Sequence, residues 1–364
     1  MSYAKVLWKR VKRAPMVRAL RPLLRWTPPD ALADGYSIAV GCMRSLAPVA
    51  AANMRLLARG RPGALREIML VFDCTEAELP SQVLALHERL DWPCPVRILT
   101  YTSEQVRVAR RIHWGWVYSW LSWSLAIEHC RTRHLVLHDL DALPLEPTLF
   151  DRLYQGACTA GTVFHGIRPY TGAWIGAADG LVTTFELVLQ PGVLRARFQP
   201  IDAFNRAGLI GGRYVDFDTL LWIQHQVKSG SVQPLDESEL VHPSQLICNY
   251  TDFVAGRGNL PRIQHSLVLL PYFEYLGGDT TQLDAATAAL RDPQRGTIPL
   301  SGRPPPVGHL RPAHWAWTEK QIRRVEQALY GATRPAVEAF LAGIVQRCGA
   351  ARTVDREPGG VAAR

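Results

Sequence analysis

Two aspartates one residue apart are the part of the sequence best suited to chemistry. Asp139 and Asp141 directly follow residues 134–138 (HLVLH), an apolar run that predicts a buried strand. Side chains two residues apart in an extended segment point to the same side, so these carboxylates can converge. Adjacent carboxylates repel each other unless a cation lies between them or one of them is protonated. Because oxygen ligands select Mg²⁺ or Mn²⁺, we expect one of these ions as the cofactor. Two solvated acids in a strand-ending turn are the alternative.

The elements before this pair alternate between strand and helix patterns. Strands are expected at 36–41, 67–72 and 96–101, and helices at 45–58, 81–90 and 112–130. Strands separated by helices are joined by right-handed crossovers, so the pattern predicts an α/β fold with a mainly parallel, Rossmann-like sheet flanked by helices. Ligands of such sheets bind outside the carboxyl ends of the strands. Since Asp73 ends the second strand, we expect Asp73, Asp139 and Asp141 at one cleft.

The second half of the chain is less regular. A helix is expected at 181–190 and another from Asp218, and a terminal helix is expected at about 318–346 after a Pro/Gly-rich connection at 291–308. We therefore expect a basic N-terminal arm at 1–30, one α/β domain at 31–349 with an irregular second half from about residue 151, and a disordered tail at 350–364.

Positive charge is concentrated at the start of the chain. The formal net charge is +9, and residues 1–29 hold eight lysines and arginines and no acid, so the rest of the chain carries 33 bases against 32 acids. Bases mixed with Trp8, Trp26 and several leucines suit an anionic membrane surface. A solvated basic tail is the alternative. Pro15 and Pro22 are expected to limit any helix there to short pieces. Nucleic acid is not an expected partner, because the body has no basic stripe or known binding motif.

The cysteines and the hydropathy bear on location. The seven cysteines are scattered and form no CxxC pair, which favours reduced thiols in a cytoplasmic protein. No run approaches the roughly 20 apolar residues that a membrane span needs. We therefore expect a cytoplasmic protein, which the basic arm could hold peripherally on the inner membrane face.

Three segments together resemble the nucleotide-sugar glycosyltransferases of the GT-A fold: strand 36–41, the acid-ended strand 67–73, and 134–141 with its continuation 142–150 (ALPLEPTLF). The resemblance implies that Asp139 and Asp141 hold Mn²⁺ or Mg²⁺ on the diphosphate or ribose of the donor. It also implies that Asp73 and Arg44 lie beside the nucleoside. Asp73 as a helix cap or turn residue is the alternative.

A second, looser resemblance lies near the C-terminus. Residues 308–315 (GHLRPAHW) are similar to the late His-x-Gly-x-Lys-Pro-Trp segment of some retaining glycosyltransferases. The resemblance implies that His309 is a third metal ligand and that Arg311 contacts the diphosphate. This chain departs from that pattern, with Leu310 in place of the glycine and two extra residues before Trp315. A loop histidine and a surface arginine are the alternative.

Two more acids stand before an expected helix in residues 214–221 (YVDFDTLL). In inverting members of the resembled superfamily, an acid at the start of a late helix is the general base for the acceptor hydroxyl. By this resemblance Asp218 is the catalytic base, with Asp216 as its substitute. Asp218 is equally suited to be the N-cap of the helix. His242 is a lone histidine and is expected to be structural.

The resemblance implies a metal-dependent glycosyltransferase that moves a sugar from a nucleotide-diphosphate donor to a saccharide or lipid-linked acceptor. The nucleotide would bind to about 31–150 and the acceptor to about 151–349, and cell-envelope polysaccharide or glycolipid assembly is the expected setting. Two alternatives stay open. One is an aspartate-nucleophile phosphatase of the haloacid-dehalogenase type, although Leu143 stands where its motif has Thr. The other is a non-catalytic relative that uses the arm to dock at membranes or partners.

Overall fold

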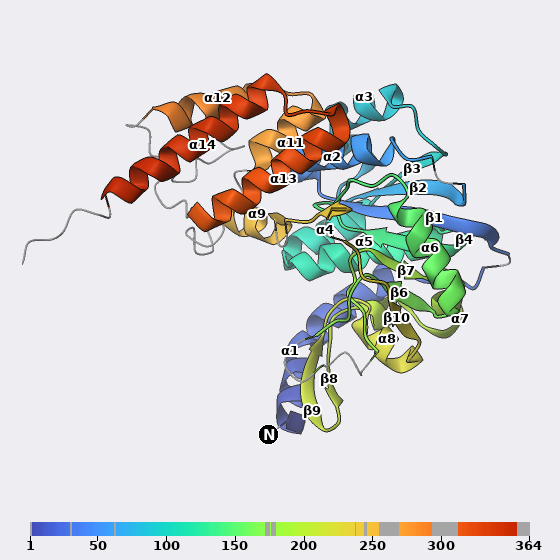
Figure 1. The fold of residues 1–364 in the computed structure, drawn as a ribbon. Coiled ribbons are helices and arrows are strands. Elements are labelled where there is room, and N and C mark those ends of the chain that lie inside the picture. Colours follow the sequence, from blue (N-terminus) through green and yellow to red (C-terminus); the bar gives the residue numbers. More distant parts are fainter. Residues whose placement is uncertain are drawn as a thin grey trace, which may run out of the picture.

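The computed structural model describes residues 2–29, 31–61, 63–171, 175, 180–236, 238–243, 246–254, 269–292 and 312–354. At the centre of this part lies a seven-stranded sheet with the order β10-β6-β7-β4-β1-β2-β3 (Figure 1). Its strands are β1 (Ala33–Cys42), β2 (Leu65–Phe72), β3 (Val96–Thr100), β4 (Thr132–His138), β6 (Phe164–Gly166), β7 (Leu187–Leu189) and β10 (Gly230–Val232). All neighbours in this sheet pair in parallel except β7, which runs antiparallel to β4 and β6. The predicted α/β class with a mainly parallel sheet is confirmed.

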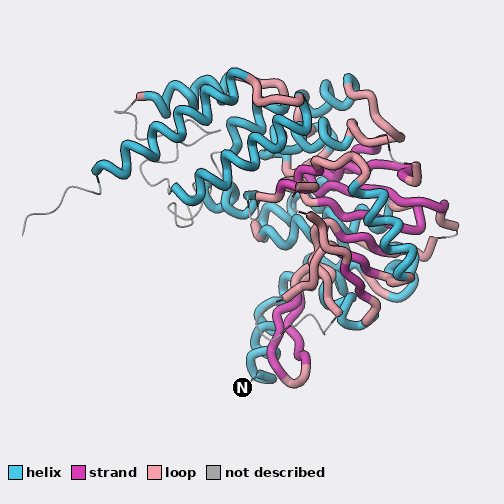
Figure 2. The backbone as a smooth tube through the Cα atoms, viewed as in Figure 1, coloured by secondary structure: helices cyan, strands magenta, loops and turns pink. Residues whose placement is uncertain are grey.

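Alternate residues of the central strands pack on opposite faces of the sheet. Val40 and Val136 belong to one apolar cluster, whereas Ala39 and Leu137 belong to the other. The first face is covered by α2 (Ala47–Leu57), α3 (Ser81–Arg89), α6 (Leu149–Ala160) and α11 (Leu269–Gly277), and the second by α4 (Ser103–Ile112), α5 (Gly115–His129) and α7 (Pro191–Arg197). Figure 2 shows helices on both sides of the strands. Because both faces are buried, the strands are continuous apolar runs, which made them recognisable in the sequence.

The N-terminal segment forms one continuous helix, α1 (Ser2–Leu20), which runs through Pro15. The expectation that Pro15 limits the helix to short pieces is wrong. Packing explains the difference, because Val6 and Leu20 are buried against the body and tertiary contacts offset the local cost of the proline. Pro22 does lie beyond the end of α1, in a short 3₁₀ turn (η1, Arg21–Leu23).

Two elements of the second half differ from expectation. Residues 181–190 contain strand β7 instead of a helix, because Leu187, Val188 and Leu189 extend the sheet between β4 and β6. The helix expected from Asp218 begins three residues later, as α8 (Leu221–Val227). It follows a hairpin of β8 (Arg206–Ile210) and β9 (Arg213–Phe217), whose turn consists of two glycines with positive φ. In Figure 1 this hairpin lies beside α1, away from the C-terminal helices.

The C-terminal region is helical. Besides α11 it contains α9 (Leu246–Val254), α12 (Thr281–Arg291), α13 (Pro312–Tyr330) and α14 (Pro335–Val354). The single helix expected at about 318–346 is two helices, because Gly331 with a φ of +73° ends α13 and Pro335 begins α14. α14 continues past residue 350, where a disordered tail was expected, and 355–364 lie outside the described residues. No helix in the described part of the chain combines the length and apolarity that a membrane crossing requires.

Candidate metal centre

The two aspartates of the 134–141 segment lie in a turn at the carboxyl end of β4. The backbone N–H of Ala142 donates to the carbonyl of Asp139 and closes this turn. The chain then enters β5 (Leu143–Pro144), which pairs antiparallel with β11 (Leu240–Val241). This pairing brings His242, the residue after β11, to the aspartates.

His242, Asp139 and Asp141 form a compact cluster. The Nε2 atom of His242 lies 3.6 Å from Oδ1 of Asp141 and 3.8 Å from Oδ2 of Asp139. One ligand atom from each of the three side chains lies within 4.8 Å of the others. The predicted convergence of the two carboxylates is confirmed. His242 was expected to be only structural, but its side chain lies in the cluster with them.

The charges of the cluster perturb one another. Burial and the carboxylate of Asp141 raise the pKa of Asp139 to about 7, although His242 lowers it. Burial lowers the pKa of His242, but the two aspartates outweigh this effect and raise it above its usual value. Without a metal ion, Asp139 and His242 therefore bind protons more tightly than an ordinary aspartate and histidine do. Two carboxylates and an imidazole are ligands that suit Mn²⁺ or Mg²⁺, and a cation there would relieve the same repulsion, so the residues fit the expected metal.

Access to the cluster is uneven. The side chain of Asp141 is 5% exposed and that of His242 is 16% exposed, whereas Asp139 is 32% exposed. A ligand can therefore approach from the Asp139 side, while Asp141 and His242 are held by the surrounding protein.

A buried network lies behind the aspartate turn. The side-chain amide of Asn53, on α2, donates to the carbonyls of Asp139 (3.4 Å), Leu140 (3.1 Å) and Ala142 (2.8 Å). With its nitrogen so placed, its oxygen faces Nε2 of His138 at 3.1 Å. The backbone of the turn is thus fixed by a side chain from another element.

His138 connects this network to Glu186. Its Nδ1 lies 2.6 Å from Oε1 of Glu186, and neither side chain is exposed. Because the Asn53 oxygen can only accept, Nε2 of His138 is the nitrogen that donates to it, and Nδ1 faces the carboxyl group of Glu186. Glu186 adopts a φ of +49°, an uncommon conformation for a residue with a side chain, and its Oε2 has no hydrogen-bond partner among the described residues.

Asp73 and Arg44 meet at the neighbouring strand ends, as expected. The backbone N–H of Arg44, in the turn after β1, donates to Oδ1 of Asp73, just after β2, at 2.7 Å. Burial raises the pKa of Asp73, although Arg44 and Arg110 oppose this effect. A hollow of about 450 Å³ lies here, lined by Arg44, Ser45, Asp73, Arg110 and Tyr118. Cations, a carboxylate and an aromatic ring therefore face one space at the carboxyl edge of the sheet.

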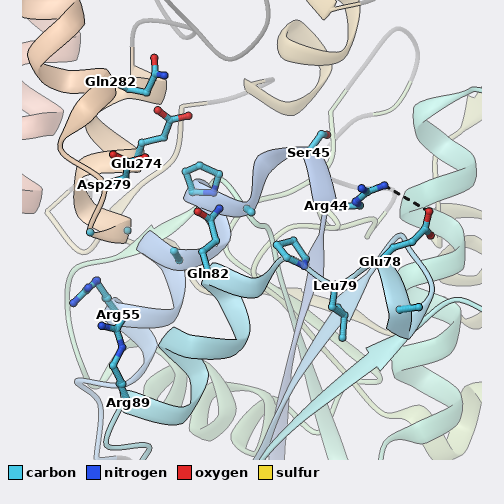
Figure 3. A pocket seen from close by; sticks show the side chains of 17 residues that line it. Arg44, Ser45, Arg55, Glu78, Leu79, Gln82, Arg89, Glu274, Asp279 and Gln282 are labelled. Atoms are coloured by element: carbon cyan, nitrogen blue, oxygen red, sulfur yellow. Dashed lines mark ion pairs between the residues drawn. The ribbon is translucent and has the colours of Figure 1, made fainter.

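A larger hollow of about 970 Å³ shares Arg44 and Ser45 with the first (Figure 3). It lies between α2, α3 and the junction of α11 with α12. Figure 3 shows Arg55 and Arg89 at one side of it and Glu274 and Asp279 at another. Neither Asp139 nor Asp141 lines this hollow, and its basic and acidic side chains are equally numerous, so it offers no clear preference for an anion.

The two acids around β9 have different environments. Asp216, on the strand, accepts two hydrogen bonds from the guanidinium of Arg13 at 2.6 and 2.8 Å. Asp218, just after the strand, accepts from the amide of Asn205 at 2.8 Å and from the backbone N–H of Thr219 at 2.7 Å, both through Oδ1. Its Oδ2 has no hydrogen-bond partner within the described residues.

Asp218 lies near the metal cluster and is not a helix cap. Its charge contributes to the raised pKa of Asp139, which places the two acids within electrostatic reach of each other. The N-cap of α8 is Leu220, with a φ of +67° and no side-chain cap. The N-cap alternative for Asp218 is therefore wrong.

His309 and Arg311, implied by the second resemblance, lie outside the described residues. Nothing in the sequence pointed to Asn53 or Glu186, and His242 was expected to be structural. The only local signal for His242 was its place after the short apolar pair 240–241, which many histidines share.

Comparison with known proteins gives matches among solved structures. No protein-family model matches it, and no curated protein matches it. It is similar to the mannosyltransferase PcManGT from Pyrobaculum calidifontis in complex with GDP-Man and Mn²⁺, with 12% identity, 98% of this chain and 97% of that chain covered, and a TM-score of 0.39. S. aureus TarS 1–349 gives 9% identity, 90% and 94% coverage and a TM-score of 0.38. The galactosyltransferase LgtC in complex with donor and acceptor sugar analogues shares 10% identity, with 56% of this chain and 74% of that chain covered and a TM-score of 0.37. At these identities and TM-scores the likeness is weak, and function is inferred from the site itself.

Proposed function

We propose that this protein is a metal-dependent glycosyltransferase that moves a sugar from a nucleotide-diphosphate donor to an acceptor hydroxyl. The observation that carries the proposal is the cluster of Asp139, Asp141 and His242 at the carboxyl edge of a parallel sheet. The hollow beside Asp73 and Arg44 lies at the ends of β1 and β2 on the same edge. A cation site and a polar hollow at one sheet edge suit a ligand with a diphosphate at one end and a nucleoside at the other.

Asp139, Asp141 and His242 would hold Mn²⁺ or Mg²⁺. Such an ion, when bound, neutralises the negative charge that builds on a departing nucleoside diphosphate. Arg44 and Asp73 would bind and orient the nucleoside part. His309 and Arg311 remain proposed as a further metal ligand and a diphosphate contact.

Asp218 is the proposed general base if the reaction inverts configuration at the sugar. Asn205 and Thr219 hold Oδ1 of Asp218, which leaves Oδ2 to accept the proton of the acceptor hydroxyl. Asp216 is a poorer base, because its carboxylate is already paired with Arg13. The electrostatic interaction between Asp218 and Asp139 supports a role for Asp218 in the same reaction.

The proposed acceptor is a saccharide or a lipid-linked saccharide, as in envelope polysaccharide or glycolipid assembly. The proposed location is the cytoplasm, with peripheral attachment to the inner face of the membrane. The support for this part is the concentration of positive charge in residues 1–29, which form α1 and the segment after it.

A panel of nucleotide sugars and nucleoside diphosphates, each with and without Mn²⁺, tests the proposal. We expect one nucleoside diphosphate to raise the melting temperature only when Mn²⁺ is present, and its sugar conjugate to be slowly hydrolysed. Asp141→Asn should lose both effects, whereas Asp284→Asn, an exposed site on α12, should keep them. Release of phosphate from a generic phosphate ester, without any donor binding, would favour the phosphatase alternative.

A further inference from the structure

The outer face of α1 is unusually apolar. Tyr3 is 76% exposed, Leu7 64%, Trp8 57% and Val11 64%. Tyr3, Leu7 and Val11 are spaced by four residues and share one side of the helix, with Trp8 next to them. The other exposed large apolar side chains of the described residues are spread over α3, α5, β10, α13 and α14, with at most two on any one element, whereas these four lie together on one helix.

An adjoining side of α1 is fixed to the body. Val6 and Arg13 are buried, and Arg13 forms its bidentate ion pair with Asp216 on β9. Arg10 donates from Nε to the carbonyl of Ala207 on β8 at 3.0 Å. Residues 2–20 therefore do not form a solvated basic tail. They form a helix that packs on the body and exposes a defined face to solvent.

Basic side chains surround the apolar face. Lys5 and Lys12 are exposed, and the ammonium groups of Lys9 and Lys12 lie 5.7 and 5.1 Å from the Trp8 ring. Residues 1–29 contain no acid, while the rest of the chain is almost neutral. Most of the excess positive charge of the chain is therefore carried by α1 and the segment directly after it.

We propose that α1 docks the protein onto the surface of an anionic phospholipid bilayer. Tyr3, Leu7, Trp8 and Val11 would enter the boundary between headgroups and acyl chains, and the bases would contact the anionic headgroups. Each base near such a surface strengthens binding about fivefold (about 1 kcal/mol). A bilayer fits this face better than a protein groove, because the amphipathic ring of Trp and a rim of lysine are both favoured at the headgroup level.

The docked helix is connected to the proposed catalytic acid. Arg13 holds Asp216, and Asp218 follows two residues later, at the end of the same strand. On the proposed function, this connection keeps the acceptor side of the active site close to a lipid-linked acceptor. Docking itself does not depend on that function and can be measured without any substrate.

Sedimentation of the full-length protein with vesicles tests the proposal. Vesicles of phosphatidylglycerol and phosphatidylcholine are compared with vesicles of phosphatidylcholine alone. We expect binding to the anionic vesicles only, weakened by added salt. The variant Leu7→Glu/Trp8→Glu/Val11→Glu should bind at least about tenfold more weakly, because three exposed apolar groups become acids. Val345→Glu, at an equally exposed apolar site on α14, should bind like the wild type.

Several results would overturn docking. One is a wild type that does not bind anionic vesicles, and another is a triple variant that binds them as well as the wild type does. A third is self-association of the wild type that the triple variant loses, because a second copy of the chain would then cover this face. Asp141→Asn separates the two proposals, since it should bind vesicles normally while losing metal-dependent donor binding. A wild-type protein that binds the donor but not the vesicles would overturn the docking proposal and leave the proposed function standing.

Discussion

Nε2 of His242 lies 3.6 Å from Oδ1 of Asp141, although long stretches of chain separate the two residues. The contact exists because β5, directly after the aspartate turn, pairs with β11, directly before His242. The metal cluster is therefore assembled by a long-range strand pairing and not by a local motif. Because His242 and the two aspartates come from separate segments of the chain, each can be replaced and tested separately.

Replacing His242 should weaken metal binding without unfolding the protein. His242→Asn removes one of three proposed ligands, so we expect Mn²⁺ affinity to fall by at least the roughly 10- to 100-fold that loss of an outer-shell partner causes. Isothermal titration calorimetry measures this effect. His129→Ala, an exposed histidine at the end of α5, is the matched control and should leave the affinity unchanged. An unaltered affinity in His242→Asn would show that another residue is the third ligand.

Mn²⁺ affinity should depend on pH with a midpoint set by Asp139. Because the pKa of Asp139 is raised to about 7, protons compete with the metal below that pH. Affinity should therefore rise as pH increases through about 7 and then level off, and binding near pH 6 should release protons from both Asp139 and His242, whose pKa values are both raised. Calorimetry in buffers of different ionisation enthalpy detects the released protons. An Mn²⁺ affinity that stays constant between roughly pH 5 and 8 would contradict the assignment of Asp139 as a ligand, because this interval spans its pKa.

The same pKa has the opposite consequence for the metal-free fold. A carboxyl group whose folded pKa lies above its unfolded value binds protons more tightly in the folded state. The contribution of Asp139 to stability should therefore increase as pH falls from about 7 towards the ordinary range of an aspartate. Thermal melting in EDTA, compared with Asp139→Asn, measures this contribution. A variant with the same pH slope as the wild type would place the titration elsewhere.

Asn53 should stabilise both the fold and the metal centre. Asn53→Ala removes the donor to three carbonyls and the partner of His138, so the free energy of unfolding should fall by roughly 2–4 kcal/mol. Urea denaturation measures the loss, and Mn²⁺ titration at low temperature should show weaker binding by the remaining folded protein. Gln82→Ala on α3, exposed and without such contacts, is the control. Normal metal affinity in Asn53→Ala would mean that the turn holds its shape alone.

Asp218→Asn should separate chemistry from binding. Loss of a general base typically lowers the rate by roughly 10²- to 10⁴-fold, whereas Asn keeps the size of the side chain and leaves the metal ligands in place. We expect Mn²⁺-dependent donor binding to persist while turnover falls. Full turnover by Asp218→Asn would remove this residue from the mechanism.

Asp216→Asn should instead loosen α1 from the body, because the variant loses the ion pair with Arg13. Limited trypsin digestion, which cleaves after the lysines and arginines of residues 5–12, detects the loosened helix.

The sequence allowed prediction wherever the signal was local. The run 134–138 and the spacing of Asp139 and Asp141 sufficed to predict a strand that ends in two converging carboxylates, because a buried parallel strand is apolar throughout. Asp73 and Arg44 were also placed together correctly, since neighbouring parallel strands end at one edge.

The parts that escaped prediction depend on tertiary contacts. β5 and β11 have two residues each, too few to leave a periodic pattern, so His242 could not be connected to the aspartates. Asn53 looks like an ordinary polar residue of an alanine-rich helix, and its role follows only from where α2 packs. Pro15 predicted a break that packing of α1 on the body prevents.

Titration of the protein with Mn²⁺, followed by electron paramagnetic resonance of the free ion, shows whether Asp139 and Asp141 hold a metal. We expect saturable binding that a nucleoside diphosphate tightens. Asp139→Asn and Asp141→Asn should each weaken it severely, while Asp284→Asn should bind as the wild type does. Undiminished binding in Asp141→Asn, or no response to any nucleoside diphosphate, would contradict this prediction.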